Sequence, residues 1–424
     1  MKIRVPGDKS ISQRALILSS LAEGESRVRG LLTGGDPAST ASALRALGAE
    51  IPTTDHWDKE IRIRGLGLRG LSTPEAHLDL GNSGTGARLL LGVLAGQAIQ
   101  AVVTGDESLR SRPMGRITDP LSSMGARFEA LGEPGRLPIR VVGGALRPLE
   151  YRMPVASAQL KSALLLAGLV GGVPVSLQEP SRSRDHTESM LRGAGVPVQS
   201  GPGSEGWKVS LPVHQTALHP LDLDVPGDIS SAAFFLLLGL LRGGEEPLVL
   251  EGVGLNQTRT GILTVLQRMG AEIRLVNQRG EDSGEPMGDL VVLPSQLTGT
   301  TVGGSEIPLL IDEIPVLVVG ALRARGETRI TGAGELRVKE TDRIRAPVAN
   351  LRALGVEAEE LDDGLAIEGT GKPLSGSVES FGDHRIAMAF GILGALPGNS
   401  IQIRGEQVAG VSFPGFWELL EKLR

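Results

Sequence analysis

The sequence predicts an α/β protein of two domains, each built from three similar units. Two periodic features support this prediction. Six times, a short segment of small and polar residues runs directly into an aliphatic helix, at intervals of roughly 70–85 residues. Between these helices a second amphipathic stretch ends at a glycine and resumes as a β-rich run. One such unit is too small to close a core alone, so it must pack on its neighbours.

The six predicted helices share a polar start and a body rich in alanine, leucine, isoleucine and valine. They lie within residues 6–24, 80–96, 154–169, 226–241, 311–326 and 381–398. The unpaired N–H groups at the start of a helix attract anions. Because most of the notable polar residues lie at these starts, the pattern predicts that they bind anionic groups. The start at Asp228 carries no cation, and we expect it to be structural.

The second helix of a unit is marked by the glycine that ends it. Five such helices end at Gly48, Gly125, Gly195, Gly270 and Gly355. Glycine is favoured there because it has no Cβ to clash in a left-handed conformation. Strands are predicted near residues 173–180, 247–253, 328–334 and 400–406. Each unit therefore contains two helices separated by strands.

Composition narrows the possible functions. A chain of 424 residues is too long for one ordinary hydrophobic core and fits two domains. Because aromatic residues make up only 3%, aliphatic side chains must fill the two cores. The absence of cysteine excludes disulfides, thiolate metal sites and a cysteine nucleophile. The histidines do not pair at metal-ligand spacing, so we expect no metal site. No apolar leader or membrane-length stretch is present, which predicts a cytoplasmic protein without a membrane partner.

The net charge of −6 argues against nucleic acid as a partner. Basic residues nevertheless gather at the motifs. They are Lys9, Arg14, Arg88, Arg110, Arg112, Lys161, Arg184, Lys339, Arg343 and Arg385. An acidic protein that concentrates cations at helix starts is typical of a receptor for a small polyanion.

Three motifs in the first half suit anions. In PGDKSISQR, Ser10 and Arg14 lie one helical turn apart and, with Lys9, could hold a carboxylate or phosphate, although the spacing is not that of a nucleotide-binding loop. The glycine-spaced turn 81–88 exposes backbone N–H groups. Arg112 precedes a proline, at the mouth of a helix, where it could make a bidentate contact.

Further polar residues mark the later helix starts. Ser157 and Gln159 are neutral and suit hydroxyls and phosphate oxygens. Asp312 is predicted at the end of an apolar strand, and Glu340 is flanked by Lys339 and Arg343. Two acids in one cleft could divide general-base and general-acid work, although capping and ion pairing would also account for them.

These residues stand in motifs that resemble the 5-enolpyruvylshikimate-3-phosphate (EPSP) synthase family, in its bacterial class II branch. The motifs, in order, are PGDKSISQRAL, GNSGTGARL, TGDESLRSRPMGR, ASAQLKSALLLAGL, SRDHTESML, PGDISSAAF, IDEIP, ELRVKETDRI, GDHRIAMAF and SFPGFWELL. The resemblance spans essentially the whole chain.

The resemblance implies the enolpyruvyl transferase fold, an inside-out α/β barrel with two domains of three βαβαββ-type units. It implies one domain over residues 9–226 and a second over residues 1–8 and 227–424. The implied reaction transfers the carboxyvinyl group of phosphoenolpyruvate to the 5-hydroxyl of shikimate 3-phosphate, a step of aromatic amino acid biosynthesis. It needs no metal or organic cofactor, and we expect a monomer.

The resemblance also implies roles for individual residues. Asp312 would accept the hydroxyl proton, Glu340 would protonate the methylene carbon, and Lys9 would contact both substrates. The shikimate 3-phosphate ligands would be Lys9, Ser10, Arg14, Ser157, Gln159, Arg184, Asp312 and Lys339. The phosphoenolpyruvate ligands would be Lys9, Asn82, Gly84, Arg112, Gln159, Arg343 and Arg385.

Two positions distinguish this chain within the family. Many members have a lysine where Val411 stands, so that contact is absent or another cation replaces it. Some herbicide-insensitive members carry alanine where this chain has Gly84, so we expect room for the inhibitor glyphosate.

Three other functions compete with this reading. A sister enzyme that uses UDP-N-acetylglucosamine usually has a loop cysteine, which is absent here. A non-catalytic scaffold is disfavoured by the presence of both Asp312 and Glu340, and a nucleic-acid-end-processing enzyme by the acidic charge and the sparse aromatics.

Overall fold

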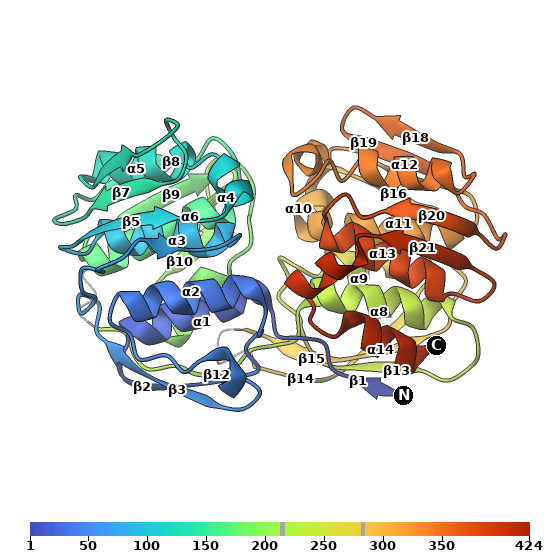
Figure 1. Cartoon of the computed structure of the whole chain (residues 1–424), viewed down its shortest axis with the longest axis horizontal. Helices are drawn as coiled ribbons and strands as arrows, with labels where there is room; N and C mark the ends of the chain where they lie inside the picture. Colours follow the sequence, from blue (N-terminus) through green and yellow to red (C-terminus); the bar gives the residue numbers. More distant parts are fainter. Residues whose placement is uncertain (213–216, 281–284) are drawn as a thin grey trace. The chain divides into compact units, whose positions relative to one another are not determined.

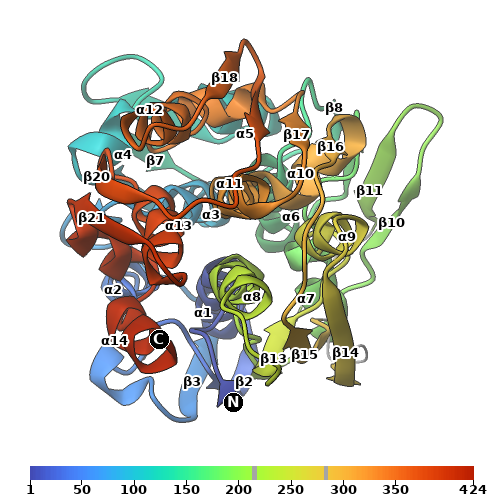
Figure 2. The same cartoon turned by 90° about the vertical axis from the view of Figure 1, so that its right-hand side faces the viewer.

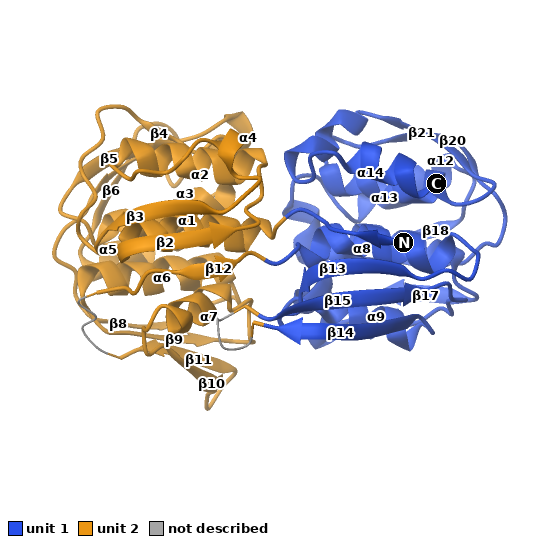
Figure 3. Ribbon diagram, turned by 90° about the horizontal axis from the view of Figure 1, so that it is seen from below, with its two compact units in different colours: residues 1–6, 226–279, 286–424 blue, residues 7–225, 280–285 orange. Residues whose placement is uncertain are grey.

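The computed structural model describes residues 1–212, 217–280 and 285–424. The chain forms two compact units, coloured in Figure 3. Unit 1 comprises residues 1–6, 226–279 and 286–424, and unit 2 comprises residues 7–225 and 280–285. The predicted second domain included residues 280–285, which the structure assigns to unit 2. The reason is local, because the buried carboxylate of Glu285 lies 2.9 Å from His186 Nδ1 of that unit.

Two sheets of unit 2 have the same topology, in the strand orders β4-β5-β7-β6 and β8-β9-β11-β10. In each sheet, the two strands that come first in the sequence are parallel to one another. The strand that comes last in the sequence, β7 or β11, lies between the second and the third and is antiparallel to both. The strands are β4 (Leu78–Asp79), β5 (Gln100–Thr104), β6 (Arg127–Ala130), β7 (Ile139–Val142), β8 (Leu149–Arg152), β9 (Val175–Glu179), β10 (Gln199–Pro202) and β11 (Trp207–Leu211).

Helices connect these strands in a fixed pattern. One helix joins the parallel pair, α3 (Gly84–Ala95) or α6 (Ala158–Gly171). A second precedes the third strand, α5 (Gly115–Met124) or α7 (His186–Gly193). The short α4 (Glu107–Ser111) precedes α5. Each set is thus a βαβαββ unit, as the resemblance implied.

The two units exchange the strand that precedes their first helix. In unit 2, β2 (Glu23–Arg29) pairs with β3 (Ile61–Leu66) and, in parallel, with β12 (Asp222–Asp224). In unit 1, β1 (Lys2–Ile3) pairs in parallel with β13 (Leu248–Gly254). Yet β1 precedes α1 (Lys9–Leu21) of unit 2, and β12 precedes α8 (Ile229–Leu241) of unit 1. Helix α2 (Gly35–Ala46) and the 3₁₀ turn Thr54–His56 lie between β2 and β3.

Within the described residues, unit 1 contains three sheets, in the orders β1-β13-β15-β14, β16-β17-β19-β18 and β20-β21. The remaining strands are β14 (Glu272–Arg279), β15 (Met287–Leu293), β16 (Thr301–Val302), β17 (Glu327–Ile330), β18 (Ala358–Leu361), β19 (Gly364–Glu368), β20 (Ser375–Glu379) and β21 (Ser400–Arg404). The remaining helices are α9 (Gly261–Arg268), α10 (Ile307–Leu310), α11 (Ile314–Arg323), α12 (Arg345–Ala353), α13 (His384–Ala395) and α14 (Phe416–Leu423). Short 3₁₀ helices cover Gly304–Glu306, Ile311–Glu313, Gly334–Val338 and Glu406–Val411.

The six predicted aliphatic helices are confirmed and form the two cores. Helices α1, α3 and α6 are buried along nearly their whole length in unit 2, as are α8, α11 and α13 in unit 1. Figures 1 and 2 show strands and shorter helices around these core helices within each unit. A Cβ on Gly92 of α3 would lie 2.2 Å from the Ala163 carbonyl oxygen of α6, so glycine permits this close helix contact.

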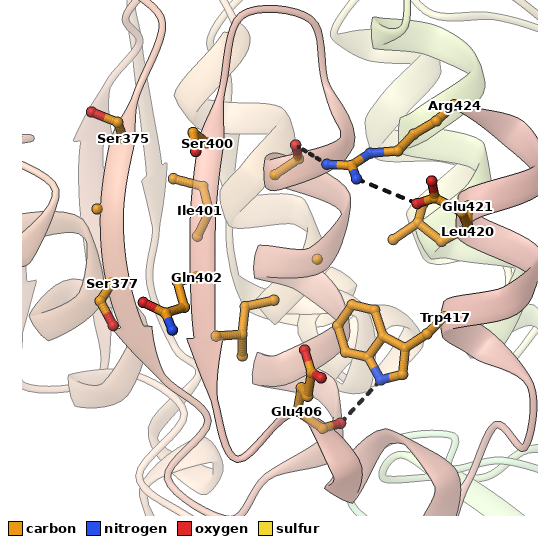
Figure 4. Close-up of a pocket in the computed structure, with 14 residues that line it drawn as sticks. Ser375, Ser377, Ser400, Ile401, Gln402, Glu406, Trp417, Leu420, Glu421 and Arg424 are labelled. Atoms are coloured by element: carbon orange, nitrogen blue, oxygen red, sulfur yellow. Dashed lines mark hydrogen bonds and ion pairs between the residues drawn. The ribbon is translucent and has the colours of Figure 1, made fainter.

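Among the described residues, the last sheet of unit 1 has only two strands, the parallel pair β20 and β21 joined by α13. In the same described ranges it does not have the antiparallel hairpin that completes the four-stranded sheets. A groove of about 780 Å³ lies there between β20, β21, α13 and α14 (Figure 4). Trp417 Nε1 donates to the Glu406 carbonyl at 3.1 Å beside it, and Arg424 reaches the Gly394 carbonyl at 2.9 Å. None of the fourteen residues that line the groove is a candidate site residue, so it lies apart from the predicted chemistry.

Candidate functional site

The predicted site residues fall into one group in each unit, and each group is described by itself. The unit 2 group is Lys9, Ser10, Arg14, Asn82, Gly84, Arg112, Ser157, Gln159 and Arg184. The unit 1 group is Asp312, Lys339, Glu340, Arg343 and Arg385.

The starts of the core helices position most of the unit 2 group. Lys9 and Gly84 are the first residues of α1 and α3, and Ser157 is the N-cap of α6. The Ser83 hydroxyl accepts from the Gly86 N–H at 3.0 Å, and the Ser157 hydroxyl accepts from the Leu160 N–H at 3.4 Å. One cap satisfies only part of the unpaired N–H groups, so each start remains a favourable place for an anion.

Arg88 joins two parts of this group. Its Nη1 donates to Gln159 Oε1 at 2.7 Å, and Gln159 Nε2 donates to Thr85 Oγ1 at 3.0 Å. Arg112 Nη2 donates to Asn82 Oδ1 at 2.7 Å. Both guanidinium groups approach Gly84, since a Cβ there would lie 3.0 Å from Arg88 Nη1 and 3.1 Å from Arg112 Nη1. The structure therefore brings four predicted positions, Asn82, Gly84, Arg112 and Gln159, together around Arg88.

Electrostatics favour an anion at this place. Burial, together with the charges of Arg116 and Arg112, lowers the pKa of Arg88 to about 10. The group remains protonated at neutral pH, and it donates hydrogen bonds to the neutral oxygens of Gln159 and Pro113. A bound phosphate or carboxylate would relieve the repulsion among these cations. The resemblance assigned Arg88 no role, although its place in GNSGTGAR was a signal.

Ser10, Arg14 and Arg184 gather at a second place. Arg14 Nη1 donates to the Ser10 carbonyl at 3.0 Å, and its Nε donates to Thr187 Oγ1 at 2.8 Å. Burial lowers the pKa of Arg14 to about 10, against the opposing charges of Glu188, Asp8 and Glu285. The charge of Arg184 also lowers the pKa of Arg14, so the two cations lie within electrostatic reach of one another.

Two lysines have partners that the sequence did not reveal. Lys9 Nζ lies 3.0 Å from Asp36 Oδ2, in the first turn of α2. Lys161 was predicted as one of the cations available to an anion, and this is wrong. Its side chain is fully buried, with Nζ 2.7 Å from Glu179 and 2.8 Å from Glu188. None of the three acidic partners, Asp36, Glu179 and Glu188, lies at a recognisable spacing in the sequence from its lysine, so only the folded structure identifies them.

Arg343 is the centre of the unit 1 group. Its Nε lies 2.7 Å from Asp383 Oδ2 and its Nη2 lies 2.7 Å from Glu340 Oε2. Its Nη1 lies 3.4 Å from Asp312 Oδ1. Burial alone would lower the pKa of Arg343, but Glu340 and Asp383 outweigh it, so the pKa is raised above its ordinary value. One guanidinium therefore holds both predicted catalytic acids.

The other cations of unit 1 also meet Asp312. Lys339 Nζ lies 3.9 Å from its Oδ1, and Arg385 Nη1 donates to its carbonyl at 3.0 Å. This cluster of three acids (Asp312, Glu340 and Asp383) and three cations (Lys339, Arg343 and Arg385) has the groups to bind an anion and exchange protons with it. Sequence reasoning missed that Asp383 pairs with Arg343. The buried Asp383 carboxylate also caps α13, because it accepts a hydrogen bond from the Arg385 N–H at 2.8 Å.

One sequence prediction about helix starts is wrong. Asp312 does not end a strand, because residues 307–310 form α10 and Asp312 lies in the 3₁₀ turn that leads into α11. A short apolar run does not distinguish a strand from a buried helix, and a proline lies in the first turn of both flanking helices. The start at Asp228, whose own segment carries no cation, meets one from a later segment, since Arg259 Nη2 lies 3.4 Å from the Asp228 carboxylate.

Two negative findings apply to the described ranges. Among these residues, no group of three or more histidine, aspartate and glutamate side chains could hold a metal ion. No helix within them is long and apolar enough to cross a membrane.

Comparison with known proteins gives consistent results. Residues 1–420 match the family model described as EPSP synthase (3-phosphoshikimate 1-carboxyvinyltransferase). The 3-phosphoshikimate 1-carboxyvinyltransferase of Desulfitobacterium hafniense (strain DSM 10664 / DCB-2) is 49% identical over 422 residues, covering 100% of this chain and 95% of the relative. That of Pelotomaculum thermopropionicum is 50% identical over 423 residues, with 99% and 96% covered.

Solved structures with the same fold include two enzymes. EPSP synthase from Acinetobacter baumannii is 42% identical with a TM-score of 0.89, covering 100% of this chain and 95% of that chain. The enolpyruvyl transferase NikO from Streptomyces tendae has a TM-score of 0.76 at 18% identity, covering 100% and 94%, which shows a shared fold alone.

The Arg343 cluster predicts a large effect on stability. Replacing Arg343 by methionine leaves the buried Asp383 carboxylate without its cation, which should cost about 3–5 kcal/mol. Urea unfolding followed by circular dichroism would measure the loss. The matched control is Arg345→Met, on the exposed side of the same helix start, which should change the free energy of unfolding by less than about 0.5 kcal/mol. Equal unfolding midpoints for the two variants would contradict the central place of Arg343.

Proposed function

Because the chain belongs to the EPSP synthase (3-phosphoshikimate 1-carboxyvinyltransferase) family, we propose that it transfers the carboxyvinyl group of phosphoenolpyruvate to the 5-hydroxyl of shikimate 3-phosphate. The products are 5-enolpyruvylshikimate 3-phosphate and phosphate, in the pathway to chorismate and the aromatic amino acids. The observation that carries this proposal is the family match over residues 1–420, which includes every predicted site residue.

The unit 2 group supplies most of the proposed contacts with shikimate 3-phosphate. Ser10 and Arg14 hold its carboxylate, and Ser157 and Arg184 hold its phosphate. Supporting this division, Arg14 lies beside Ser10, whereas Ser157 lies at the start of another core helix. Lys9 and Gln159 contact both substrates, and Asp312 and Lys339 complete the set.

Phosphoenolpyruvate takes the second set of cations. Its proposed ligands are Asn82, Gly84 and Arg112 near the start of α3, together with Arg343 and Arg385. The two substrates bring two phosphates and two carboxylates together, so their mutual repulsion must be offset by arginine and lysine. Helix starts add roughly 0.3–1 kcal/mol each. Val411 stands where many members have a lysine, so that contact is absent or another cation supplies it.

The two acids carry the proton transfers. Asp312 accepts the proton of the 5-hydroxyl as its oxygen attacks C2 of phosphoenolpyruvate, and Glu340 protonates the methylene carbon C3. Loss of phosphate and of a methyl proton then restores the double bond. The negative charge of phosphoenolpyruvate beside Glu340 favours the protonated acid, as the donor role requires. No metal or organic cofactor takes part, and the protein acts as a cytoplasmic monomer on small molecules.

The direct test is phosphate release from a mixture of the protein, shikimate 3-phosphate and phosphoenolpyruvate. We expect release only when both substrates are present. The control replaces shikimate 3-phosphate by UDP-N-acetylglucosamine, the acceptor of the sister enzyme. Release with that acceptor and none with shikimate 3-phosphate would refute the proposal.

The acid–base roles predict that Asp312→Asn and Glu340→Gln each lower kcat by about 10²- to 10⁴-fold. Both variants should still bind shikimate 3-phosphate, since the amides keep the shape of the carboxyl groups. Glu335→Gln, an exposed position in the turn before Glu340, is the matched control and should keep normal turnover. Near-normal turnover in either test variant would remove that residue from the mechanism.

Gly84 predicts sensitivity to glyphosate. The wild-type enzyme should be inhibited below millimolar concentrations, because Gly84 places no methyl group beside Arg88 and Arg112. In Gly84→Ala the new methyl group would lie 3.0–3.1 Å from both guanidinium groups, and should raise the inhibitory concentration by about tenfold. Gly201→Ala, where a Cβ meets nothing within 4 Å, is the control. A flat inhibition curve for the wild type would disprove the expectation.

A further inference from the structure

A buried cluster of charges joins the segments of unit 2 that carry proposed shikimate 3-phosphate ligands. Lys161 lies in α6, Glu179 is the last residue of β9, and Glu188 lies in α7. All three side chains are fully buried, and Lys161 Nζ lies 2.7 Å and 2.8 Å from the two carboxylates. Lys161 therefore has no surface from which to touch a ligand, and it acts only on its neighbours.

The second oxygen of Glu179 is used to hold a loop. Ser183 Oγ donates to Glu179 Oε2 at 2.6 Å, and the Ser183 N–H donates to Oε1 at 3.4 Å. Lys161 Nζ also donates to the Ser183 carbonyl at 3.4 Å. Ser183 is thus bound through its side chain and both backbone polar groups. The next residue is Arg184, which is only partly buried and is the proposed phosphate ligand.

The same cluster reaches the helix that carries Arg14. The Ser162 and Thr187 hydroxyls, which follow Lys161 and precede Glu188, lie 2.6 Å apart. Arg14 donates to Ser162 at 2.9 Å and to Thr187 at 2.8 Å. The carboxylate ligand and the phosphate ligand of the proposed substrate therefore share one buried anchor.

Buried ion pairs of this kind are a poor source of stability, because desolvation consumes most of their attraction. They do impose a definite geometry, since removal of any member leaves a buried charge without a partner. Here the ion pair fixes the position of Ser183, and the residue that follows Ser183 in the loop is Arg184, the proposed phosphate ligand.

We propose that Glu179 is a positioning residue for shikimate 3-phosphate: held by Lys161, it fixes Ser183 and so aims Arg184 at the substrate phosphate. This inference rests on the proposed function and deepens it. It assigns the Glu179–Ser183 hydrogen bond an effect on one substrate only, because Ser183 borders Arg184 and none of the proposed phosphoenolpyruvate ligands.

The test variant is Ser183→Ala, which removes a single hydroxyl. It should raise the KM for shikimate 3-phosphate by about tenfold, with the KM for phosphoenolpyruvate and kcat changed less than about twofold. Glu179→Gln, which removes the charge and keeps the volume, should change the same constant in the same direction. Ser181→Ala is the matched control, because Ser181 lies in the same loop and is exposed, and it should behave as wild type.

A double-mutant cycle separates positioning from general weakening of the fold. In an Arg184→Ala background, Ser183→Ala should have no further effect on the KM for shikimate 3-phosphate, because its effect passes through Arg184. Additive effects, or equal rises in both KM values, would overturn the positioning role. The wild-type assay is read first: if it shows no phosphate release from the two substrates, the proposed function fails, and this inference with it.

Discussion

The burial of the six core helices is the constraint on which the rest of this structure depends. A helix surrounded by protein must have the N–H groups of its first turn satisfied or turned toward an anion. Asp8, Ser83, Ser157, Asp228 and Asp383 each supply one capping bond. The N–H groups that remain give the starts of these helices their affinity for negative charge. Polar function is therefore concentrated at the ends of the most apolar elements of the chain.

Two of the cations near these starts are paired with carboxylates within the protein. Lys9 is paired with Asp36, and Arg343 is paired with Asp312, Glu340 and Asp383. Arg88 is the contrasting case, since it donates hydrogen bonds to neutral oxygens. A binding site that must accept several negative charges gains from such internal pairing, because unpaired buried cations would be costly before the ligand arrives. Asp312 and Glu340, two of the carboxylates that balance Arg343, are the proposed proton-transfer groups.

The βαβαββ repeats differ in the residues that lie at the N-termini of their core helices. In unit 2 the helices α3 and α6 share a contact through Gly92 and a polar link from Arg88 to Gln159. In unit 1 the start of α8 is closed by Arg259, which donates to Ser230 at 2.7 Å and lies beside Glu313. One repeat thus carries proposed ligands, whereas another carries a buried ion-pair network. The last repeat of unit 1 has a two-stranded sheet, with a groove beside α14.

The sequence by itself determined the six core helices and the glycine-terminated second helices, and it supplied the candidate site residues, because these depend on local periodicity and on motifs that are contiguous in the chain. The tertiary structure alone decided which charges meet. Lys161 and Glu179, Arg14 and Thr187, and Arg343 and Asp383 are brought together by packing across distant segments. It also decided that β1 and β12 are exchanged between units, that residues 280–285 join unit 2, and that the run before Asp312 is helical. Pairings of this kind depend on distances between elements, which no local pattern of residues encodes.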